Sequence, residues 1–199
     1  MRTKLAVLAG GIAIAAVAAA CSSSPTTKSG TETISGTESG QAAATLLGTN
    51  SNVQPVFPVF TYTGPVNTSA KNYKLPGGDA KTETDTLVTP VGNLTLTHTR
   101  TYQAGNNTVP TVVGKTGNVC TLTLVGEKGT YVTVPAKSTG QFKGATGHGT
   151  YTITLQIGAA LPAGKTTCNI NDWGANGPKA IAQGSSFTFK ATGPLTVSS

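Results

Sequence analysis

Three polar side chains that could do chemistry stand at every second position of one threonine-rich segment: His98, Arg100 and Tyr102. Because the side chains of a β-strand alternate between its two faces, they share a face with Leu94 and Leu96. If the leucines point inward, a basic group lies inward beside them, where an unpaired charge is costly. We predict these three side chains as ligand-binding residues, suited to an amphipathic ligand with an anionic or carbonyl head. The alternative is that His98 and Arg100 form a rim pair satisfied by solvent and neighbouring backbone.

Catalytic residues are not identified by this sequence. Seven acidic side chains are present: Glu32, Glu38, Asp79, Glu83, Asp85, Glu127 and Asp172. We expect all of them in a tether, in loops or turns, or around a weak strand near Asp85, and none on a clear inward face. The serine and threonine hydroxyls are too numerous for a Ser-His-Asp arrangement to be chosen among them. The sequence therefore favours a binding or structural protein over an enzyme.

The spacing of Gly144, Gly147 and Gly149 is close to that of a phosphate-binding loop. Such loops lead into a helix whose N-terminus holds the anion, but the residues that follow here alternate as in a strand. We therefore predict a glycine-rich corner, with His148 exposed at it. A metal site that joined His148 to His98 would also need a carboxylate or thiolate nearby, so we expect no metal and no cofactor.

The elements that must position these residues are strands. Tyr151, Ile153, Leu155 and Ile157 alternate with polar residues, which is typical of a half-buried antiparallel strand. About eight such strands are expected, at residues 53–63, 82–88, 93–102, 109–113, 118–125, 130–134, 150–157 and 185–191. We predict a hairpin turn at residues 126–129 and long loops at 65–79 and 159–182. The fold class is all-β: an antiparallel eight-stranded closed barrel, or alternatively a β-sandwich.

The N-terminus indicates export. Arg2 and Lys4 precede an apolar run of 16 residues, which is short for a transmembrane helix of about 20 residues, so residues 1–20 are predicted as a signal peptide. Ala18-Ala19-Ala20-Cys21 resembles a bacterial lipobox, and we predict lipidation of Cys21. Ordinary signal peptidase could also cut this bond, which would release a soluble protein.

The cysteine count supports lipidation, because three cysteines are an odd number for an exported chain. If Cys21 carries acyl chains, Cys120 and Cys168 remain as one pair, and we predict a disulfide between them. The nearby Trp173 is expected to pack under its loop, although an exposed tryptophan could anchor a partner. Acylation would anchor the protein at the outer face of a bacterial cytoplasmic membrane.

Residues 21–52 are predicted as a disordered tether, because this Ser-, Thr-, Gly- and Ala-rich stretch has few large apolar side chains. The barrel domain would then span residues 53–199. The formal charge of the whole chain is +7, and removal of Arg2 and Lys4 with the signal peptide leaves +5. The lysines are scattered singly, without the basic stripe that nucleic-acid binding requires, so we expect no nucleic-acid partner. No protein partner can be named.

Several motifs together resemble secreted actinobacterial proteins related to the allene oxide cyclase and dirigent barrels. They are, in chain order, residues 91–98, Cys120, residues 129–131, residues 140–151, Cys168 and residues 193–195. The most specific is Phe142-Lys143-Gly144-Ala145-Thr146-Gly147-His148-Gly149-Thr150-Tyr151. The resemblance covers roughly residues 87–199 and implies an eight-stranded, calycin-like barrel. It carries over no activity, because most of these bacterial relatives have none assigned and a fold does not determine function.

Three functions remain open on these grounds. The first is a lipid-anchored binding module for a small amphipathic ligand held in the barrel. The second is a structural or interaction protein of the envelope with a filled core. The third, which we expect least, is an isomerase-like or cyclase-like enzyme. The plant enzymes that the chain resembles use acidic groups inside the barrel, so an inward carboxylate would favour the third.

Overall fold

Nine antiparallel strands make up most of the computed structural model, which describes residues 26–41, 43, 56–74, 80–104, 108–176 and 178–198. The strands are β1 (Thr27–Ser39), β2 (Val56–Thr63), β3 (Thr68–Lys74), β4 (Thr82–Thr89), β5 (Gly92–Gln103), β6 (Thr111–Thr116), β7 (Val119–Thr133), β8 (Thr146–Ala160) and β9 (Ala180–Ser198). Three short 3-10 helices join them: η1 (Pro135–Lys137), η2 (Gly140–Phe142) and η3 (Ile170–Asn176). No helix in the described part of the chain is long and apolar enough to cross a membrane. Cys21 and the predicted signal peptide lie outside the described residues.

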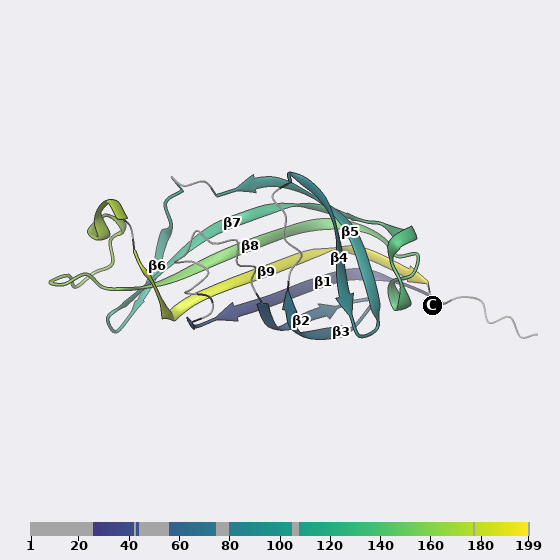
Figure 1. Ribbon diagram of the computed structural model, residues 1–199, viewed down its shortest axis with the longest axis horizontal. Coiled ribbons are helices and arrows are strands. Elements are labelled where there is room, and N and C mark those ends of the chain that lie inside the picture. Colours follow the sequence, from purple (N-terminus) through teal and green to yellow (C-terminus); the bar gives the residue numbers. More distant parts are fainter. Residues whose placement is uncertain are drawn as a thin grey trace, which may run out of the picture.

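The nine strands belong to one sheet, so the all-β prediction is confirmed and the sandwich alternative is wrong. The sheet runs in the order β3-β2-β1-β9-β8-β7-β5-β4, with β6 paired to β7, and it curls into a half-barrel (Figure 1). Strands β7, β8 and β9 are the longest, and they extend beyond the curl to the end that carries β6 and η3 (Figure 1). The edge strands β3 and β4 approach each other where the two ends of the curled sheet meet, and we call this place the seam.

Two segments that the sequence predicted as irregular are strands. β1 runs through the predicted tether and pairs with β9 over its whole length, from Thr27 opposite Ser198 to Ser39 opposite Ser186. Local composition is poor in apolar residues there, but the backbone of β1 is fully paired and it buries Ile34 against the core. β3 lies within the loop predicted at 65–79, where it pairs with β2. Both corrections reflect the same cause, since long-range pairing with a neighbouring strand overrides weak local propensity.

The hairpin turn predicted at residues 126–129 is also wrong. β7 continues through this stretch, and its pairing with β8 shifts register between Val125 and Glu127. This is a β-bulge, in which one extra residue on one strand bends the ladder without ending it. The glycines therefore belong to a bent, continuous strand, and the bulge redirects Glu127 to the concave face.

The convex face of the sheet is polar because threonines align across it in register. One row contains Thr82, Thr99, Thr130, Thr150, Thr192, Thr33 and Thr63. Several hydroxyls pair across the strands, such as Thr84 with Thr97 at 2.9 Å. The half-buried alternation predicted for β8 thus holds, with its threonines on the solvent side. His148 is exposed, as predicted, and stands opposite Val132 of β7.

The concave face is filled by a large aromatic core. Phe57, Phe60, Tyr62 and Phe142 are almost wholly inaccessible to solvent, and the Phe60 ring stacks on Tyr73 with 4.5 Å between centroids. η2 brings Phe142 over one end of the core, so the glycine-rich corner acts as a cap on the curl (Figure 1).

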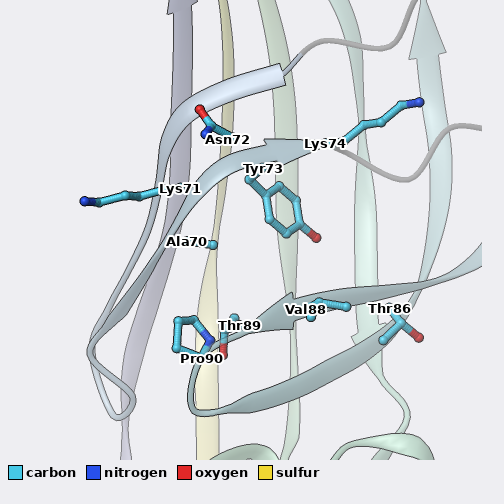
Figure 2. Close-up of a pocket in the computed structure, with 9 residues that line it drawn as sticks. All are labelled: Ala70, Lys71, Asn72, Tyr73, Lys74, Thr86, Val88, Thr89 and Pro90. Atoms are coloured by element: carbon cyan, nitrogen blue, oxygen red, sulfur yellow. The ribbon is translucent and has the colours of Figure 1, made fainter.

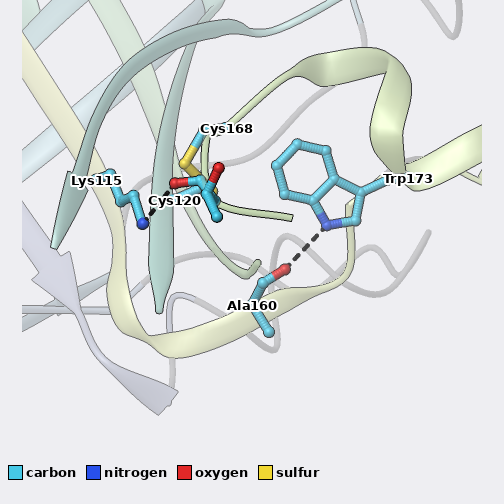
Figure 3. Close-up of a disulfide and its surroundings, with 6 residues drawn as sticks. Lys115, Cys120, Ala160, Cys168 and Trp173 are labelled. Carbon is cyan, nitrogen blue, oxygen red and sulfur yellow. Dashed lines mark hydrogen bonds between the residues drawn. A yellow bond between two sulfur atoms is a disulfide. The ribbon is translucent and has the colours of Figure 1, made fainter. Parts of the chain in front are cut away.

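A second, smaller core lies at the far end of the long strands. The predicted disulfide between Cys120 and Cys168 is present, and Leu122 and Ala159 are buried beside it. The Trp173 indole packs against this cluster and donates its Nε1–H to the Ala160 carbonyl at 3.1 Å, as Figure 3 shows. The prediction that Trp173 packs under its loop is therefore confirmed. The disulfide and the indole together fasten the segment that contains η3 to the sheet.

Two tyrosine rings on the concave face lie flat over glycines of the neighbouring strand. A Cβ on Gly149 would lie 2.7 Å from the Tyr131 ring, and a Cβ on Gly129 would lie 2.6 Å from the Tyr151 ring. Both glycines are needed for this close approach, since any side chain there would enter the ring. The two rings are thereby held against the sheet.

Candidate functional site

A belt of charged side chains crosses the concave face from β1 to β4. We call it the polar belt, and its members are Glu32, Glu83, Asp85, His98, Arg100 and Glu127. In register, Glu83 faces His98, His98 faces Tyr131, and Tyr131 faces Gly149. Gly149 lies against Gly193, which faces Glu32. One row of the sheet therefore has a carboxyl group at each end, with an imidazole and a phenol between them.

Two of the predicted site residues are held by carboxylates. His98 Nδ1 lies 2.7 Å from Asp85 Oδ2, and both side chains are largely buried. Arg100 Nη1 lies 3.6 Å from Glu127 Oε2, and the Tyr151 hydroxyl donates to Glu127 Oε1 at 2.6 Å. Neither a simple rim pair nor an unpaired guanidinium describes this arrangement. The carboxylates that pair with His98 and Arg100 come from β4 and β7, so the sequence of β5 alone could not reveal them.

Glu32 is the most buried member of the polar belt, with 1% of its surface exposed. Its Oε2 accepts the Val66 backbone N–H at 3.1 Å, whereas Oε1 has no hydrogen-bond partner among the described residues. Burial raises the pKa of this carboxyl from 4.5 to about 7, because desolvation disfavours the charged form, and the Val66 hydrogen bond offsets only part of that rise. Near neutral pH, Glu32 is therefore divided between its protonated and ionised forms.

Further polar atoms on the concave face are also unsatisfied. The Tyr62 hydroxyl and Glu83 Oε2 are buried without a hydrogen-bond partner among the described residues. Burial of Tyr62, with the ionisable groups of Tyr73 and Glu32 nearby, moves the pKa of its phenol far above the ordinary value. Burial raises the pKa of Tyr131 to about 12, with a further contribution from Glu32. The two phenols therefore stay protonated beside Glu32 and can donate as well as accept.

Tyr102, the third predicted ligand-binding residue, does not share this face. The pairing of β5 with β7 shifts register between Arg100 and Tyr102, and the bulge turns the Tyr102 side chain outward. The ring is 36% exposed and lies 5.6 Å from Lys128 Nζ, measured to its centroid. The expectation that Tyr102 points inward with His98 and Arg100 is wrong. Strict alternation fails at a bulge, which the sequence does not mark.

Half-buried apolar side chains adjoin the polar belt where the long strands leave the curl. In the row next to Arg100 and Tyr151, Ile153 and Phe189 pair across β8 and β9, and both are only partly covered. Leu155 and Phe187 form the following row and are likewise partly covered. We call these four residues the apolar strip. It leaves large apolar groups accessible beside charged ones on the same concave surface.

A separate open groove of about 550 Å³ lies at the seam between β3 and β4. Figure 2 shows the Tyr73 ring directed into it from β3 and Val88 facing it from β4. The groove is therefore lined from both edge strands of the sheet. His98 and Arg100 do not line this groove, so it is distinct from the polar belt.

The inward carboxylates are what sequence reasoning missed. Glu32, Asp85 and Glu127 were expected in the tether, at a weak strand and in a turn, and all three face the core instead. For Glu32 a signal was present, since Glu32, Ile34, Gly36 and Glu38 alternate with Thr33, Ser35 and Thr37 in the period of a strand. Glu127 carried no such signal, because the bulge beside it interrupts the alternation.

Metal coordination has no geometric support in the described ranges, where no group of three or more His, Cys, Asp or Glu side chains could hold an ion. His98 and His148 lie on opposite faces of the sheet. Comparisons with protein-family models, with curated proteins and with solved structures find no match to this chain.

Proposed function

We propose that this chain is a lipid-anchored protein of the bacterial cell envelope whose concave face binds a small amphipathic ligand. One observation carries the proposal: the polar belt lies directly beside the apolar strip on one concave surface. Glu127 stands opposite Ile153, which pairs with Phe189, and Arg100 lies in the adjacent row of the sheet. A ligand with a polar head and an apolar tail would contact both surfaces at once.

The energetic argument is the cost of unsatisfied groups. A buried polar atom without a hydrogen bond costs about 1–3 kcal/mol, and Glu32 Oε1, Glu83 Oε2 and the Tyr62 hydroxyl are three such atoms. A ligand head that bonds to one of them would recover part of this free energy. Covering the accessible parts of Phe187 and Phe189, which are only partly buried, would add about 25 cal/mol for each Å² removed from water.

Anchoring and closure of the sheet are part of the same proposal. The lipobox-like Ala18-Ala19-Ala20-Cys21 supports acylation at Cys21, and replacement by serine should move the protein from the membrane fraction to the soluble fraction. The contact between the edge strands β3 and β4 supports closure of the seam into a calycin-like barrel. Amide exchange in β3 and β4 tests closure, because paired edge strands exchange slowly.

The binding test uses the full chain with Cys21→Ser, which lacks the acylation site and can be purified without detergent. Twelve-carbon amphiphiles with different heads are titrated by calorimetry. We expect at least one to bind, and Ile153→Ser on the concave face should weaken it about tenfold. Val132→Ser is the matched control, since Val132 is a β-branched residue with 57% exposure on the convex face. Absence of binding by any head class would leave the alternative of a structural envelope protein with a filled core.

A second candidate is an isomerase-like enzyme, and the state of Glu32 favours it. A buried carboxyl whose pKa is about 7 can both accept and donate a proton near neutral pH, and the neighbouring phenol of Tyr62 could hold a substrate oxygen. Turnover of an unsaturated amphiphile that is lost in Glu32→Gln, while binding is retained, would support this candidate over simple binding.

A further inference from the structure

We propose that the ligand of the concave face carries a primary ammonium group, bound by Glu32 and the Tyr62 hydroxyl. This inference rests on the proposed binding function and adds the chemical class of the head group. It replaces the anionic or carbonyl head suggested by the basic side chains His98 and Arg100 alone.

The charge of the polar belt excludes an anion as the best partner. Four carboxyl groups face one guanidinium and one imidazole, so negative charge predominates even when His98 is protonated and Glu32 is not ionised. The positive charge of Arg100 already faces Glu127 at 3.6 Å, and Asp85 holds His98 at 2.7 Å. An entering carboxylate or phosphate would meet this excess of negative charge, whereas a cation would be attracted by it.

The hydrogen-bonding groups around Glu32 also match an ammonium ion. Such a group carries three donors and no acceptor, and Glu32 Oε1 and the Tyr62 oxygen are acceptors without partners among the described residues. Both side chains are at least nine-tenths buried, at 1% and 2% exposure. Tyr62 of β2 stands opposite Ile34 of β1, so Glu32, two residues before Ile34 on the same face, is the diagonal neighbour of Tyr62.

Aromatic rings and glycines complete the surroundings. Tyr62 lies 5.8 Å from Phe60 and from Phe142, measured between ring centroids. Ring faces attract cations, which adds to the carboxylate's attraction when water is excluded. Gly193 of β9 and Gly64 of β2 flank Glu32 and present no side chain that could donate to it.

Binding of an ammonium ion has a measurable proton balance. Below pH 7 the free Glu32 carboxyl is mostly protonated, and pairing with a cation favours its ionised form. The carboxyl O–H bond then breaks, its electron pair stays on Glu32, and the proton leaves to solvent while the ammonium keeps its own three protons. The groups that face Glu32 from other strands are Tyr62 of β2 and Tyr131 of β7, which stay neutral in this range. Affinity should therefore rise with pH between 6 and 8.

The experiment compares dodecylammonium, dodecanol and dodecanoate as probes, by calorimetry on the full chain with Cys21→Ser at pH 6 and pH 8. We expect dodecylammonium to bind about tenfold or more tighter than either other probe at pH 8, and less tightly at pH 6. Glu32→Gln should abolish this preference, so that dodecylammonium binds no more tightly than dodecanol. Asp172→Asn is the control, because Asp172 pairs with Lys165 at 2.9 Å in the distant loop. His98→Asn is a second control, and the pH dependence should persist in it because that dependence is assigned to Glu32.

The outcomes separate the two proposals. If no probe binds, the proposed binding function fails, and the head-group inference with it. If dodecanol or dodecanoate binds as tightly as dodecylammonium, or if Glu32→Gln keeps the ammonium preference, the binding function stands and the inference is overturned. Proton release from Glu32 can be measured without a substitution at Glu32. Titrations with dodecylammonium at pH 6.5, in buffers of different ionisation enthalpy, should show release of about half a proton or more. Absence of proton release would also overturn the inference that the head group is an ammonium ion.

Discussion

Asp85 Oδ2 lies 2.7 Å from His98 Nδ1, joining β4 to β5 by a diagonal contact on the concave face. Only 14% of the Asp85 side chain and 17% of the His98 side chain are exposed, so the contact is partly shielded from water. A hydrogen bond to a charged group in such a place contributes about 1.5–3 kcal/mol.

Asp85→Ala should therefore lower the free energy of unfolding by about 1.5–3 kcal/mol in urea titrations. A double-mutant cycle with His98→Ala should return a coupling energy above about 0.5 kcal/mol. Thr84→Ala is the control on the convex side of the same strand, where the exposed Thr84–Thr97 hydroxyl pair should contribute less than about 1 kcal/mol. A coupling energy near zero would contradict the assigned contact.

Glu32 should make the wild-type protein less stable as pH rises. Its pKa is about 7 in the folded state against 4.5 for the ordinary carboxyl, so the folded state binds more protons than the unfolded state between these values. Unfolding free energy then falls by about 3 kcal/mol from pH 4.5 to above pH 7. Glu32→Gln mimics the protonated form, so it should remove this slope and be the more stable protein at pH 8. Parallel pH profiles for the two proteins would contradict the prediction.

Gly149→Ala should destabilise the fold by about 1–3 kcal/mol or more, because overpacking forces neighbouring groups to move. The added Cβ would lie 2.7 Å from the Tyr131 ring and would also meet the Thr192 carbonyl oxygen. Gly114→Ala in β6 is the matched control, since nothing lies within 4 Å of its Cβ position. Thermal unfolding of both variants tests this prediction, and the midpoint temperature of Gly149→Ala should be the lower of the two. Equal midpoints would show that Tyr131 does not lie over Gly149.

The Cys120–Cys168 disulfide closes a loop with a sequence separation of 48. In the chain-entropy account, closing a loop of this length contributes about 4 kcal/mol. Cys120→Ala with Cys168→Ala should lower the urea midpoint accordingly. Quenching of Trp173 by acrylamide should increase at the same time, because the indole packs beside the bridge. Unchanged quenching would show that the loop is held by the Trp173–Ala160 hydrogen bond alone.

The all-β class and the disulfide followed from the sequence because both depend on local or compositional signals. Alternation of Tyr151, Ile153 and Leu155 with threonines has the period of a strand wherever that strand pairs. The cysteine pairing followed from elimination, since only two cysteines remain once Cys21 is assigned to a lipid. The inward direction of His98 and Arg100 followed from the same alternation and is what the structure shows.

Tertiary pairing alone decided where the charges meet. β1 is a strand because β9 pairs with it along its whole length, although its own composition resembles a flexible linker. The bulges at Val125/Glu127 and at Arg100/Tyr102 reverse the side-chain alternation, so Glu127 turns inward and Tyr102 turns outward. A one-residue shift of register is invisible in composition yet exchanges the two faces of a sheet. For that physical reason the sequence determined the class of structure and two basic site residues, whereas the carboxylates around them depended on the folded sheet.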